Sequence, residues 1–564
     1  MDKKINTQQK NKKNFIVQAG VLAAAGIVVR LIGILYRTPL VMIIGDEGNG
    51  YYNTAYNIYT IILLVSSYSI PSAISKVIAA KLGMKEYRNA YRLFMGSIIY
   101  VLIVGGLASG VCFFCAPMLV GASSARVLRV FAPTVFFSGF LGCLRGFFQA
   151  HHTMVFTSIS QILEQIANAA VSIGMAYALT SSLIGKGADE SSVAIGGAIG
   201  SAVGTGAGVL VALGFMYLVY RVNRDYIHKR MERDFTPVMS GIEIAKSIVG
   251  MVTPVVLSTF IYNLNTAANL KIYQHMMIEG KGMAEAIATT NYGLFSGKSM
   301  QIVNIPIALA AAMSSAIIPA IARTHERGEY EEGRRKMAMA IKVTMLIAIP
   351  AAFGLCVFAK PITMLLYPQR ASVDMVASMI RVLSITVVFY CLSTLSNAIL
   401  QGTGYVRKPV VNAAVAFAIQ VSVLILLLKF TNLGLYSLCI ATITYSLLMC
   451  ILNGISMYRN NGFRHDFKKE FLLPGAAALG MTLVSVITYA LTVYIIRLIV
   501  RDPSAEISGM KNVVLLIIGV GMSAVTYAVL ILKLGVATRQ ELRAMPKGSV
   551  IVRIGEKLHL FPNK

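Results

Sequence analysis

The sequence has few of the residues on which metal sites and enzyme active sites depend. Its 564 residues contain no Trp, 7 His and 7 Cys, and charged residues make up 13% of the chain. The apolar segments hold no HExxH motif, no paired carboxylates and no Ser/His/Asp set. These absences predict a protein that is not an enzyme and that carries no cofactor.

The cysteine pattern argues against a metal or redox site. All seven Cys fall in apolar segments, and Cys112 and Cys115 form a CxxC with no second pair nearby. Free Cys in such surroundings usually serves as a small apolar packing residue. His151 and His152 are adjacent, so they cannot share one helix face as a pair of ligands. We therefore predict no bound metal.

Apolar sequence is what the chain has in abundance. Hydrophobic residues make up 56% of it, and its mean hydropathy is +0.69. Runs of about 20 apolar residues, enough to cross about 30 Å of hydrocarbon, recur throughout. The prediction is an all-α polytopic membrane protein with about 14 transmembrane helices. The expected spans are residues 15–44, 51–70, 93–120, 127–149, 154–180, 193–220, 242–273, 290–321, 338–360, 375–402, 409–429, 432–457, 471–499 and 512–535.

The placement of charge predicts the orientation of these spans. The chain has 51 Lys and Arg against 24 Asp and Glu, a net charge of +27. The cations gather in alternate connecting segments, such as 76–92, 221–233 and 323–336. By the positive-inside rule these segments and both termini lie in the cytoplasm. The Lys-rich start before a long span predicts an uncleaved signal anchor. Since topology accounts for the charge, we expect no nucleic-acid partner.

Short motifs recur at matching places in the two halves of the chain. Phe-Gln-Ala at 148–150 follows the fourth span, and Leu-Gln-Gly at 400–402 follows the tenth. Segments 83–87 and 326–330, which both end in Glu-Tyr, follow the second and eighth spans. All four lie on the expected cytoplasmic side, which predicts a parallel repeat of six plus six helices.

The repeat predicts two pseudo-symmetric six-helix lobes. The expected domains are a basic cytoplasmic tail (1–14), an N-lobe of helices one to six (15–220), a basic cytoplasmic linker (221–240), a C-lobe of helices seven to twelve (241–458), two extra helices (459–535) and a second basic cytoplasmic tail (536–564). Within the sixth span, glycines recur every four residues, which predicts a face for close helix packing. They are Gly196, Gly200, Gly204 and Gly208.

Cations inside apolar spans are the first candidates for function. Arg30 and Arg37 are seven residues apart in the first span, so they share a helix face about 10 Å apart along the axis. Lys298 lies deep in the eighth span. A charge at mid-bilayer costs about 2.5–3.5 kcal/mol, so such residues usually face a cavity or a partner. Arginine forks bind phosphate well, and an anionic headgroup such as pyrophosphate is the expected ligand. The alternative is that these chains snorkel to the interface.

Polar side chains on the second and seventh spans are the second candidates. Asn53, Tyr56 and Asn57 recur at helical spacing, and Asn265 and Asn269 form a related set. Amides and phenols that line a wet cavity would suit a carbohydrate or a polar headgroup. Hydrogen bonds between helices, with tyrosines at the membrane interface, are an equally good interpretation.

Glu164 is the clearest carboxylate inside a span. It could bind a proton and couple ion movement to transport, or it could pair with a cation. We favour the pairing.

Several motifs together resemble the polysaccharide-export branch of the MATE-like (MOP) flippase superfamily, and within it the stage V sporulation protein B and YtgP group, which is related to the lipid II flippase MurJ. The motifs are Arg30-Leu31-Ile32-Gly33, Tyr36-Arg37, Gly45-Asp46-Glu47-Gly48, Ile70-Pro71-Ser72-Ala73-Ile74-Ser75-Lys76, Arg145-Gly146-Phe147-Phe148-Gln149 and Gln401-Gly402-Thr403-Gly404. The resemblance covers roughly residues 15–535.

The resemblance implies alternating access to a central cavity between two lobes. In MurJ-like proteins, basic residues on the first and eighth helices contact a lipid-linked pyrophosphate. Arg30 and Arg37 match the first-helix positions, and Lys298 falls where MurJ has an arginine. The seventh-helix carboxylate that some MurJ proteins use for sodium is replaced in the stretch 263–267, which reads Asn-Leu-Asn-Thr-Ala, so sodium coupling is not expected.

The expected function is flipping of a lipid-linked cell-wall or polysaccharide precursor, with lipid II first among the substrates. The expected partners are that lipid-linked oligosaccharide and the bilayer of a bacterial cell membrane, with a monomeric transporter that could also contact cell-wall synthesis proteins. Two alternatives stay open. One is a MATE-type cation or drug antiporter, and the other is a membrane scaffold in cell-wall or spore assembly.

Overall fold

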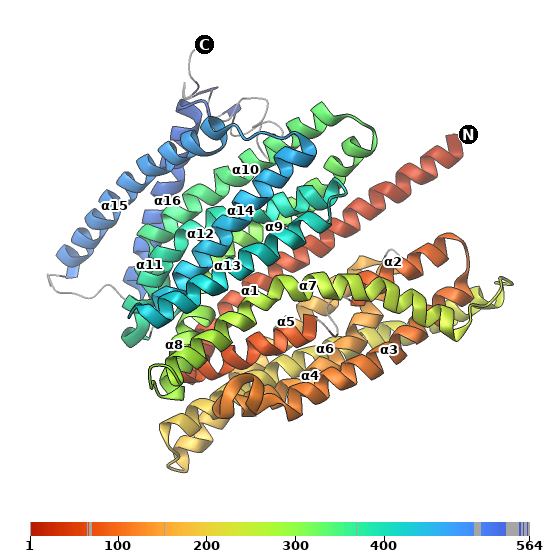
Figure 1. The fold of residues 1–564 in the computed structure, drawn as a ribbon, viewed down its shortest axis with the longest axis horizontal. Coiled ribbons are helices and arrows are strands. Elements are labelled where there is room, and N and C mark those ends of the chain that lie inside the picture. The colour runs from red at the N-terminus through yellow and green to blue at the C-terminus, as the bar shows by residue number, and fades with distance from the viewer. Residues whose placement is uncertain are drawn as a thin grey trace. The chain divides into compact units, whose positions relative to one another are not determined.

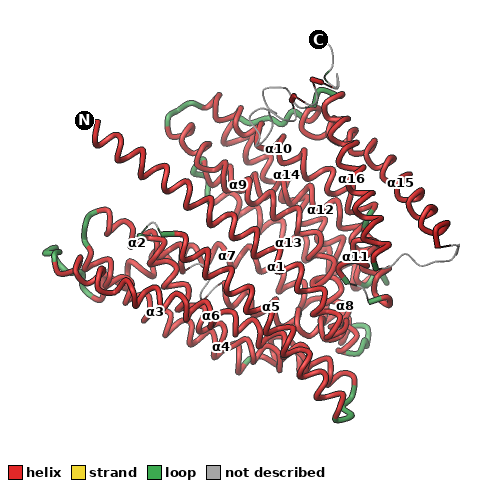
Figure 2. Tube along the Cα trace, turned by 180° about the vertical axis from the view of Figure 1, so that it is seen from behind, coloured by secondary structure: helices red, strands yellow, loops and turns green. Residues whose placement is uncertain are grey.

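Long apolar runs with few helix breakers fold as helices throughout the part of the chain that is described. The structure is a computed structural model, and it describes residues 2–64, 66, 70–151, 153–367, 369–500, 509–536, 552–553, 556–557 and 561. All regular structure in these residues is helical, as Figure 2 shows. The predicted all-α class is therefore confirmed.

The chain divides into two compact units, one that ends at Gly293 and one that begins at Leu294. Figure 1 labels their α-helices. The first unit contains α1 (Asp2–Leu63), α2 (Ile70–Gly83), α3 (Tyr87–Phe114), α4 (Ala116–Ala150), α5 (Met154–Gly185), α6 (Glu190–Glu232), α7 (Gly241–Ile278) and α8 (Glu285–Gly293). The second contains the π-helical segment η2 (Leu294–Ser299), α9 (Met300–Glu326), α10 (Tyr330–Val357), α11 (Ala359–Leu366), α12 (Arg370–Gly402), α13 (Arg407–Phe430), α14 (Leu435–Asn461), the π-helical segment η3 (Lys468–Leu472), α15 (Leu473–Val500) and α16 (Met510–Lys533).

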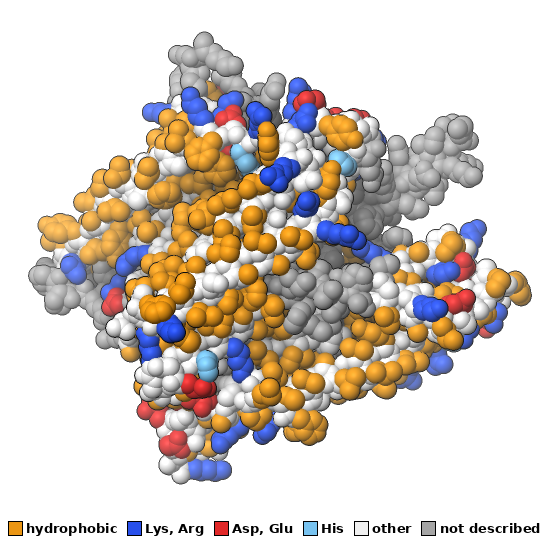
Figure 3. All heavy atoms as spheres, viewed as in Figure 1, with side chains coloured by type: hydrophobic (Ala, Val, Ile, Leu, Met, Phe, Trp, Pro, Cys, Tyr) orange, Lys and Arg blue, Asp and Glu red, His pale blue; other side chains and the backbone are white. Residues whose placement is uncertain are grey.

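The helices carry the length and surface of a membrane protein. Among the described residues, 11 helices are long and apolar enough to cross a bilayer, which is consistent with the expected spans without fixing their number. Figure 3 shows hydrophobic side chains along the flanks of the helices, while Lys and Arg gather near helix ends. Large apolar side chains such as Leu35, Phe114 and Met118 are more than two-thirds exposed. Apolar surface on this scale suits contact with lipid.

The first helix breaks where a loop is expected. Gly45 has φ 68° and ψ −176°, although helical hydrogen bonding continues on both sides of it. Backbone with this φ favours glycine, because a Cβ would clash. The expected spans 15–44 and 51–70 thus lie on the two sides of the break within α1. α1 extends to Leu63 and α2 begins at Ile70, and most of the residues between them lie outside the described part of the chain, so the end of the second span stays a prediction.

Helices α5 and α6 pack backbone against backbone along the glycine repeat. A Cβ added at Gly200 would lie 2.5 Å from the backbone nitrogen of Ala176, and one at Gly208 would lie 2.5 Å from the carbonyl oxygen of Glu164. Gly204 is equally tight against Ser172. The predicted close-packing face is confirmed, because only glycine allows backbones this near.

The turns before α3 and α10 have the same conformation, as the repeat predicts. Lys85 and Gly328 both have positive φ, at 63° and 73°. The next residues, Glu86 and Glu329, each donate the backbone N–H to the carbonyl five residues earlier, at 2.9 Å in both cases. A positive φ at a lysine is uncommon, so the shared turn is a specific feature of both units.

The turns after α4 and α12 match in the same way. Thr153 donates its N–H to the carbonyl of Phe148 at 3.1 Å, and Tyr405 donates to Leu400 at 2.8 Å. Two pairs of matching turns, each on a predicted cytoplasmic segment, support the internal repeat. The six-plus-six division into lobes stays a prediction, since α7 and α8 group with the first unit.

Most of the expected linker 221–240 is ordered. Its first part continues α6, and its last part is tied to the start of α3. Asp234 accepts the backbone N–H of Arg88 at 2.8 Å, and Asn89 donates its side-chain amide to the carbonyl of Pro237 at 2.9 Å. These bonds fix the path of the chain between α6 and α7.

Candidate functional site

Arg30 and Arg37 lie on the part of α1 that precedes Gly45, and they flank its contact with α5. Gly33 lies between them, and a Cβ added there would come within 3.3 Å of Nε2 of Gln165. Residues three and four apart share a helix face, so both arginines belong to this side of α1. Arg30 is exposed and Arg37 is half-buried.

The break in α1 brings Arg37 near phenols that follow it in the chain. An unbroken helix would place Tyr52 about 22 Å further along the axis. In the structure the charge of Arg37 acts on both Tyr52 and Tyr56. These two rings stack, with centroids 5.6 Å apart and planes 17° apart. The sequence placed Arg37 and Tyr56 in separate groups, and the structure joins them.

Glu164 pairs with an arginine from the neighbouring helix α4. Nη2 of Arg145 lies 2.7 Å from Oε2 of Glu164, and Nε of Arg145 donates to Oγ of Ser160 at 2.9 Å. The Arg145 side chain is 14% exposed and that of Glu164 is 32% exposed. The charge of Glu164 also acts on Tyr56. Its expected pairing with a cation is confirmed, and its part in ion coupling stays a prediction.

Five side chains therefore form one group in the first unit, which we call the α1 cluster: Arg37, Tyr52, Tyr56, Arg145 and Glu164. Its charged members are two arginines and one carboxylate. Phenols can donate and accept hydrogen bonds, and arginine donates from up to five N–H groups. The cluster can thus bind anionic groups and hydroxyls together.

The predicted asparagines differ in how they are satisfied. Asn53 is 3% exposed and donates its amide to the carbonyl of Asn49, one turn earlier, at 2.7 Å. Nδ2 of Asn57 and Oδ1 of Asn265 are buried without a hydrogen-bond partner in the protein. Asn269 is buried on α7. Since buried polar atoms normally form hydrogen bonds, Asn57 and Asn265 are better placed than Asn53 to take a polar ligand.

Lys298 lies in the π-helical segment η2 of the second unit and is fully buried. Its Nζ donates to Oε1 of Gln369 and, at 3.1 Å, to Oγ of Ser372. The ammonium also lies 5.4 Å from the ring centroid of Tyr367. These contacts fix the lysine against the start of α12. Segments of π-helix often mark functional positions, because they turn one side chain out of the regular helical register.

Sequence reasoning missed the groups that hold these charges. Arg145 stands in an expected span, as Arg30 does, so its position was a signal for a partner on an adjacent span. Gln369 and Ser372 gave no such signal, because neutral residues in a short connection are common. Among the described residues, no group of three or more His, Cys, Asp or Glu could hold a metal ion.

Comparison with known families decides what kind of protein this is. Residues 16–325, more than half of the chain, match the family described as polysaccharide biosynthesis protein. The chain belongs to this family. Residues 297–426 of the chain also match a second family, MatE.

Relatives of the family member span most of its length. Stage V sporulation protein B of Bacillus subtilis (strain 168) is 23% identical over 549 residues, which cover 96% of this chain and 100% of that protein. Lipid II flippase MurJ of the same organism is 22% identical over 424 residues, 72% of this chain and 76% of that protein.

A solved structure shares the fold. The inward closed conformation of lipid II flippase MurJ has a TM-score of 0.62 at 12% identity, and the match covers 90% of this chain and 98% of that one. The family member is thus a multi-pass membrane protein of the MATE-like superfamily, whose members are transporters and flippases.

Proposed function

We propose that this protein is an alternating-access transporter that flips a lipid-linked cell-wall or polysaccharide precursor across the cytoplasmic membrane. Lipid II, or another saccharide linked to undecaprenyl pyrophosphate, is the proposed substrate. The observation that carries the proposal is the pair Arg30 and Arg37 on one face of α1, with the charge of Arg37 acting on Tyr52 and Tyr56.

The chemistry of the α1 cluster suits such a substrate. A pyrophosphate is anionic, and guanidinium groups bind phosphate oxygens in pairs. The sugar carries hydroxyls, which phenols and amides can bind. Lys298 in the second unit is proposed as a third basic contact, and Asn57, Asn265 and Asn269 as polar contacts.

The family supports a polysaccharide-related substrate, and the relatives support the lipid-linked form. One relative is named as a lipid II flippase and another as a sporulation protein. We further propose that both termini are cytoplasmic, that the transporter works as a monomer in the bacterial cell membrane and that it carries no sodium site on α7.

Export of an organic cation is the second candidate, because part of the chain matches the MatE family. Such export needs a carboxylate that can exchange its partner for a proton or a cationic substrate. Glu164 is the membrane carboxylate of the α1 cluster, and Arg145 holds it at 2.7 Å. This pairing favours the anionic substrate.

The test measures lipid II in the outer leaflet of cells depleted of this protein and of any redundant flippase. Wild type should restore outer-leaflet lipid II, whereas Arg30→Ala and Arg37→Ala should each restore it about tenfold less, as expected for the loss of one arginine–phosphate contact. The control is Arg129→Ala, which removes an exposed arginine on α4 whose Nε donates to the carbonyl of Phe113. Normal lipid II exposure after depletion, or full rescue by both variants, would overturn the proposal.

A further inference from the structure

A cavity of about 430 Å³ lies in the second unit, and none of the residues proposed above lines it. It is formed by the end of α9, the start of α10, the turn after α12 and the end of α14. The α9–α10 hairpin is the green one in Figure 1. The lining residues are Ile321, Thr324, His325, Tyr330, Gly333, Arg334, Met337, Tyr405, Asn460, Asn461 and Gly462. Its volume is within the range of sites for small molecules.

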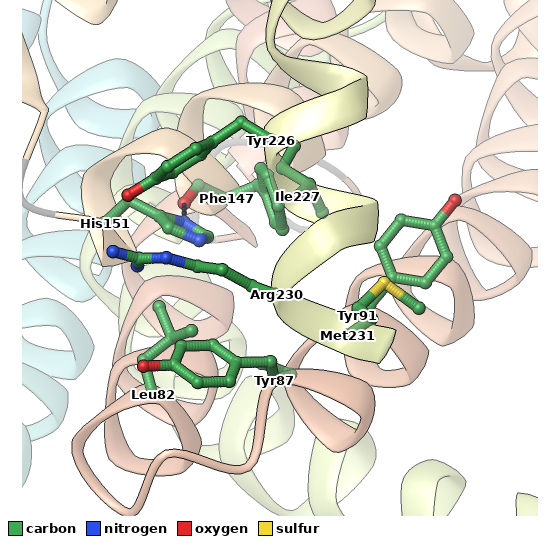
Figure 4. Close-up of a pocket in the computed structure, with 10 residues that line it drawn as sticks. Leu82, Tyr87, Tyr91, Phe147, His151, Tyr226, Ile227, Arg230 and Met231 are labelled. Carbon is green, nitrogen blue, oxygen red and sulfur yellow. Dashed lines mark hydrogen bonds between the residues drawn. The ribbon is translucent and has the colours of Figure 1, made fainter. Parts of the chain in front are cut away.

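The repeat identifies the equivalent position in the first unit, where side chains of the protein itself fill most of the cavity. Tyr87 follows the same turn as Tyr330. The guanidinium of Arg230 lies 5.4 Å from the ring centroid of Tyr87 and 4.6 Å from that of Tyr226. Figure 4 shows Arg230 between the two rings. The cavity that remains is about 20 Å³, too small for more than a water.

The second unit lacks the helix extension that provides this plug. In the first unit α6 continues to Glu232 and carries Arg230 across the cavity. In the second unit α14 stops at Asn461, and Gly462 turns the chain away with φ 62°. The open cavity is therefore a difference between two copies of one structural unit.

The cavity has the charge of an anion site. Arg334 lines it, with Nη1 donating to the carbonyl of Asn461 at 3.4 Å and Nη2 lying 2.6 Å from Oε1 of Glu331. The Glu331 side chain is 79% exposed, and exposed ion pairs contribute about 0–1 kcal/mol, so an anion can replace it. The segments that form the cavity also carry Arg323, Arg327, Arg335, Lys336, Arg407, Lys408, Arg459 and Arg464, which outnumber the carboxylates Glu326, Glu329, Glu331 and Glu332 of the α9–α10 hairpin. Such a field attracts phosphate.

The lining also has aromatic rings and an amide oxygen without a donor. His325 lies 5.4 Å from Tyr330 and 6.4 Å from Tyr405, centroid to centroid. Nδ2 of Asn461 donates to Oγ1 of Thr403 at 3.2 Å, while Oδ1 of Asn461 is buried and has no hydrogen-bond partner. The hydroxyl of Thr403 donates its proton to the backbone carbonyl of Ile399, so it acts as an acceptor toward Asn461. The bond from Nδ2 of Asn461 therefore fixes the orientation of the amide. The amide oxygen is therefore the acceptor in the lining that a ligand hydroxyl would satisfy.

We propose that this cavity binds a phosphate ester that carries hydroxyl groups, with the phosphate on Arg334 and the hydroxyls toward Asn461. The ester can be the headgroup of an anionic lipid or a soluble polyol phosphate. The site is independent of the proposed flipping activity, because it shares no residue with the α1 cluster or with Lys298.

The experiment measures binding to the purified full-length chain. One arm uses glycerol 1-phosphate with the protein in zwitterionic detergent, and the other uses nanodiscs of phosphatidylcholine with or without phosphatidylglycerol. We expect binding in at least one arm, about tenfold weaker in Arg334→Gln and weaker at high salt. The matched control is Arg335→Gln, which removes the same charge from the adjacent, exposed position and should change affinity less than threefold.

The outcomes distinguish a soluble phosphate ester from a lipid headgroup, and both of these from the absence of a site. Binding of glycerol 1-phosphate supports a soluble ligand, and binding of phosphatidylglycerol alone supports a lipid headgroup. His325→Ala, which removes one ring of the wall, should also weaken binding and guards against misfolding of Arg334→Gln. No binding in either arm, or equal losses in Arg334→Gln and Arg335→Gln, overturns the proposal.

Discussion

Arg145 and Lys298 are cations inside helices, but different groups hold them. Arg145 has a carboxylate partner in Glu164. The named partners of Lys298 are an amide, a hydroxyl and an aromatic ring. The stability of a buried cation that one carboxylate neutralises depends strongly on that carboxylate. At Lys298 the named contacts are several and neutral, so the loss of any one of them should cost less.

Glu164→Gln should therefore lower the stability of the protein. The change leaves the guanidinium of Arg145, 14% exposed, without its counter-charge. Because Glu164 is itself 32% exposed, we expect about 1–2 kcal/mol, below the value for a fully buried pair. Thermal unfolding in detergent measures the effect. Arg145→Gln combined with Glu164→Gln should recover part of it, and an unchanged Tm in the single variant would contradict the prediction.

Glu86 makes the turn between α2 and α3 sensitive to acid. Lys81, which donates to Glu86 at 2.8 Å, and then Asn89 hold the pKa of Glu86 below its ordinary value of 4.5. The unfolded chain binds the proton first, so the contribution of this carboxylate is fully present above about pH 4.5 and is lost as pH falls through the lowered value.

The measurement compares the Tm of wild type with that of Glu86→Gln. The difference should be largest near neutral pH and should shrink as the pH falls below about 4. A difference that stays constant with pH would show that Glu86 acts through its shape and not its charge.

At the scale of helices, the sequence predicted where helices lie far better than where they bend. Helices cover most of each expected span in the described residues, because apolar runs of this length have no other stable form in a membrane. The π-helical segment at Lys298 was not predicted, since one extra residue in a helical turn leaves no mark in the apolar period. The grouping of Arg37 with Tyr52 could not be predicted either, because it depends on how α1 folds back at Gly45.

The glycine face of α6 gives a direct test of helix packing. Gly200→Ala should separate α5 from α6 and lower the Tm, because its Cβ would meet backbone atoms of Ala176 at 2.5 Å. Gly214→Ala on the same helix is the matched control, since nothing lies within 4 Å of the added Cβ. It should be neutral or gain up to about 1 kcal/mol from helix propensity. Equal effects of the two variants would contradict the close-packing role of Gly200.

For the whole molecule, the repeat was visible in a few residues of sequence and reappears as matched turns. The sequence could not predict that the equivalent cavities would differ, one filled by Arg230 and the other open. That difference depends on the length of a helix end, which short motifs do not encode.

Orientation in the membrane is testable with single cysteines in a chain whose seven native cysteines have been replaced. Cysteine at Lys186, in a connection with few cations, should react with a membrane-impermeant maleimide in intact cells. Cysteine at Arg335 should react only after the cells are opened. Labelling of Arg335→Cys in intact cells would reverse the proposed topology.

The glycine contact between α5 and α6 also has a mechanical meaning. With the backbones of α5 and α6 in contact from Gly200 to Gly208, only short side chains such as that of Ser172 lie between the helices, and they leave little room for sliding. We therefore expect the two helices to move together as one rigid body. Any change in the shape of the first unit has to come from hinges elsewhere, and Gly45 of α1 and Gly121 of α4 are described helix positions where the backbone already leaves the helical path.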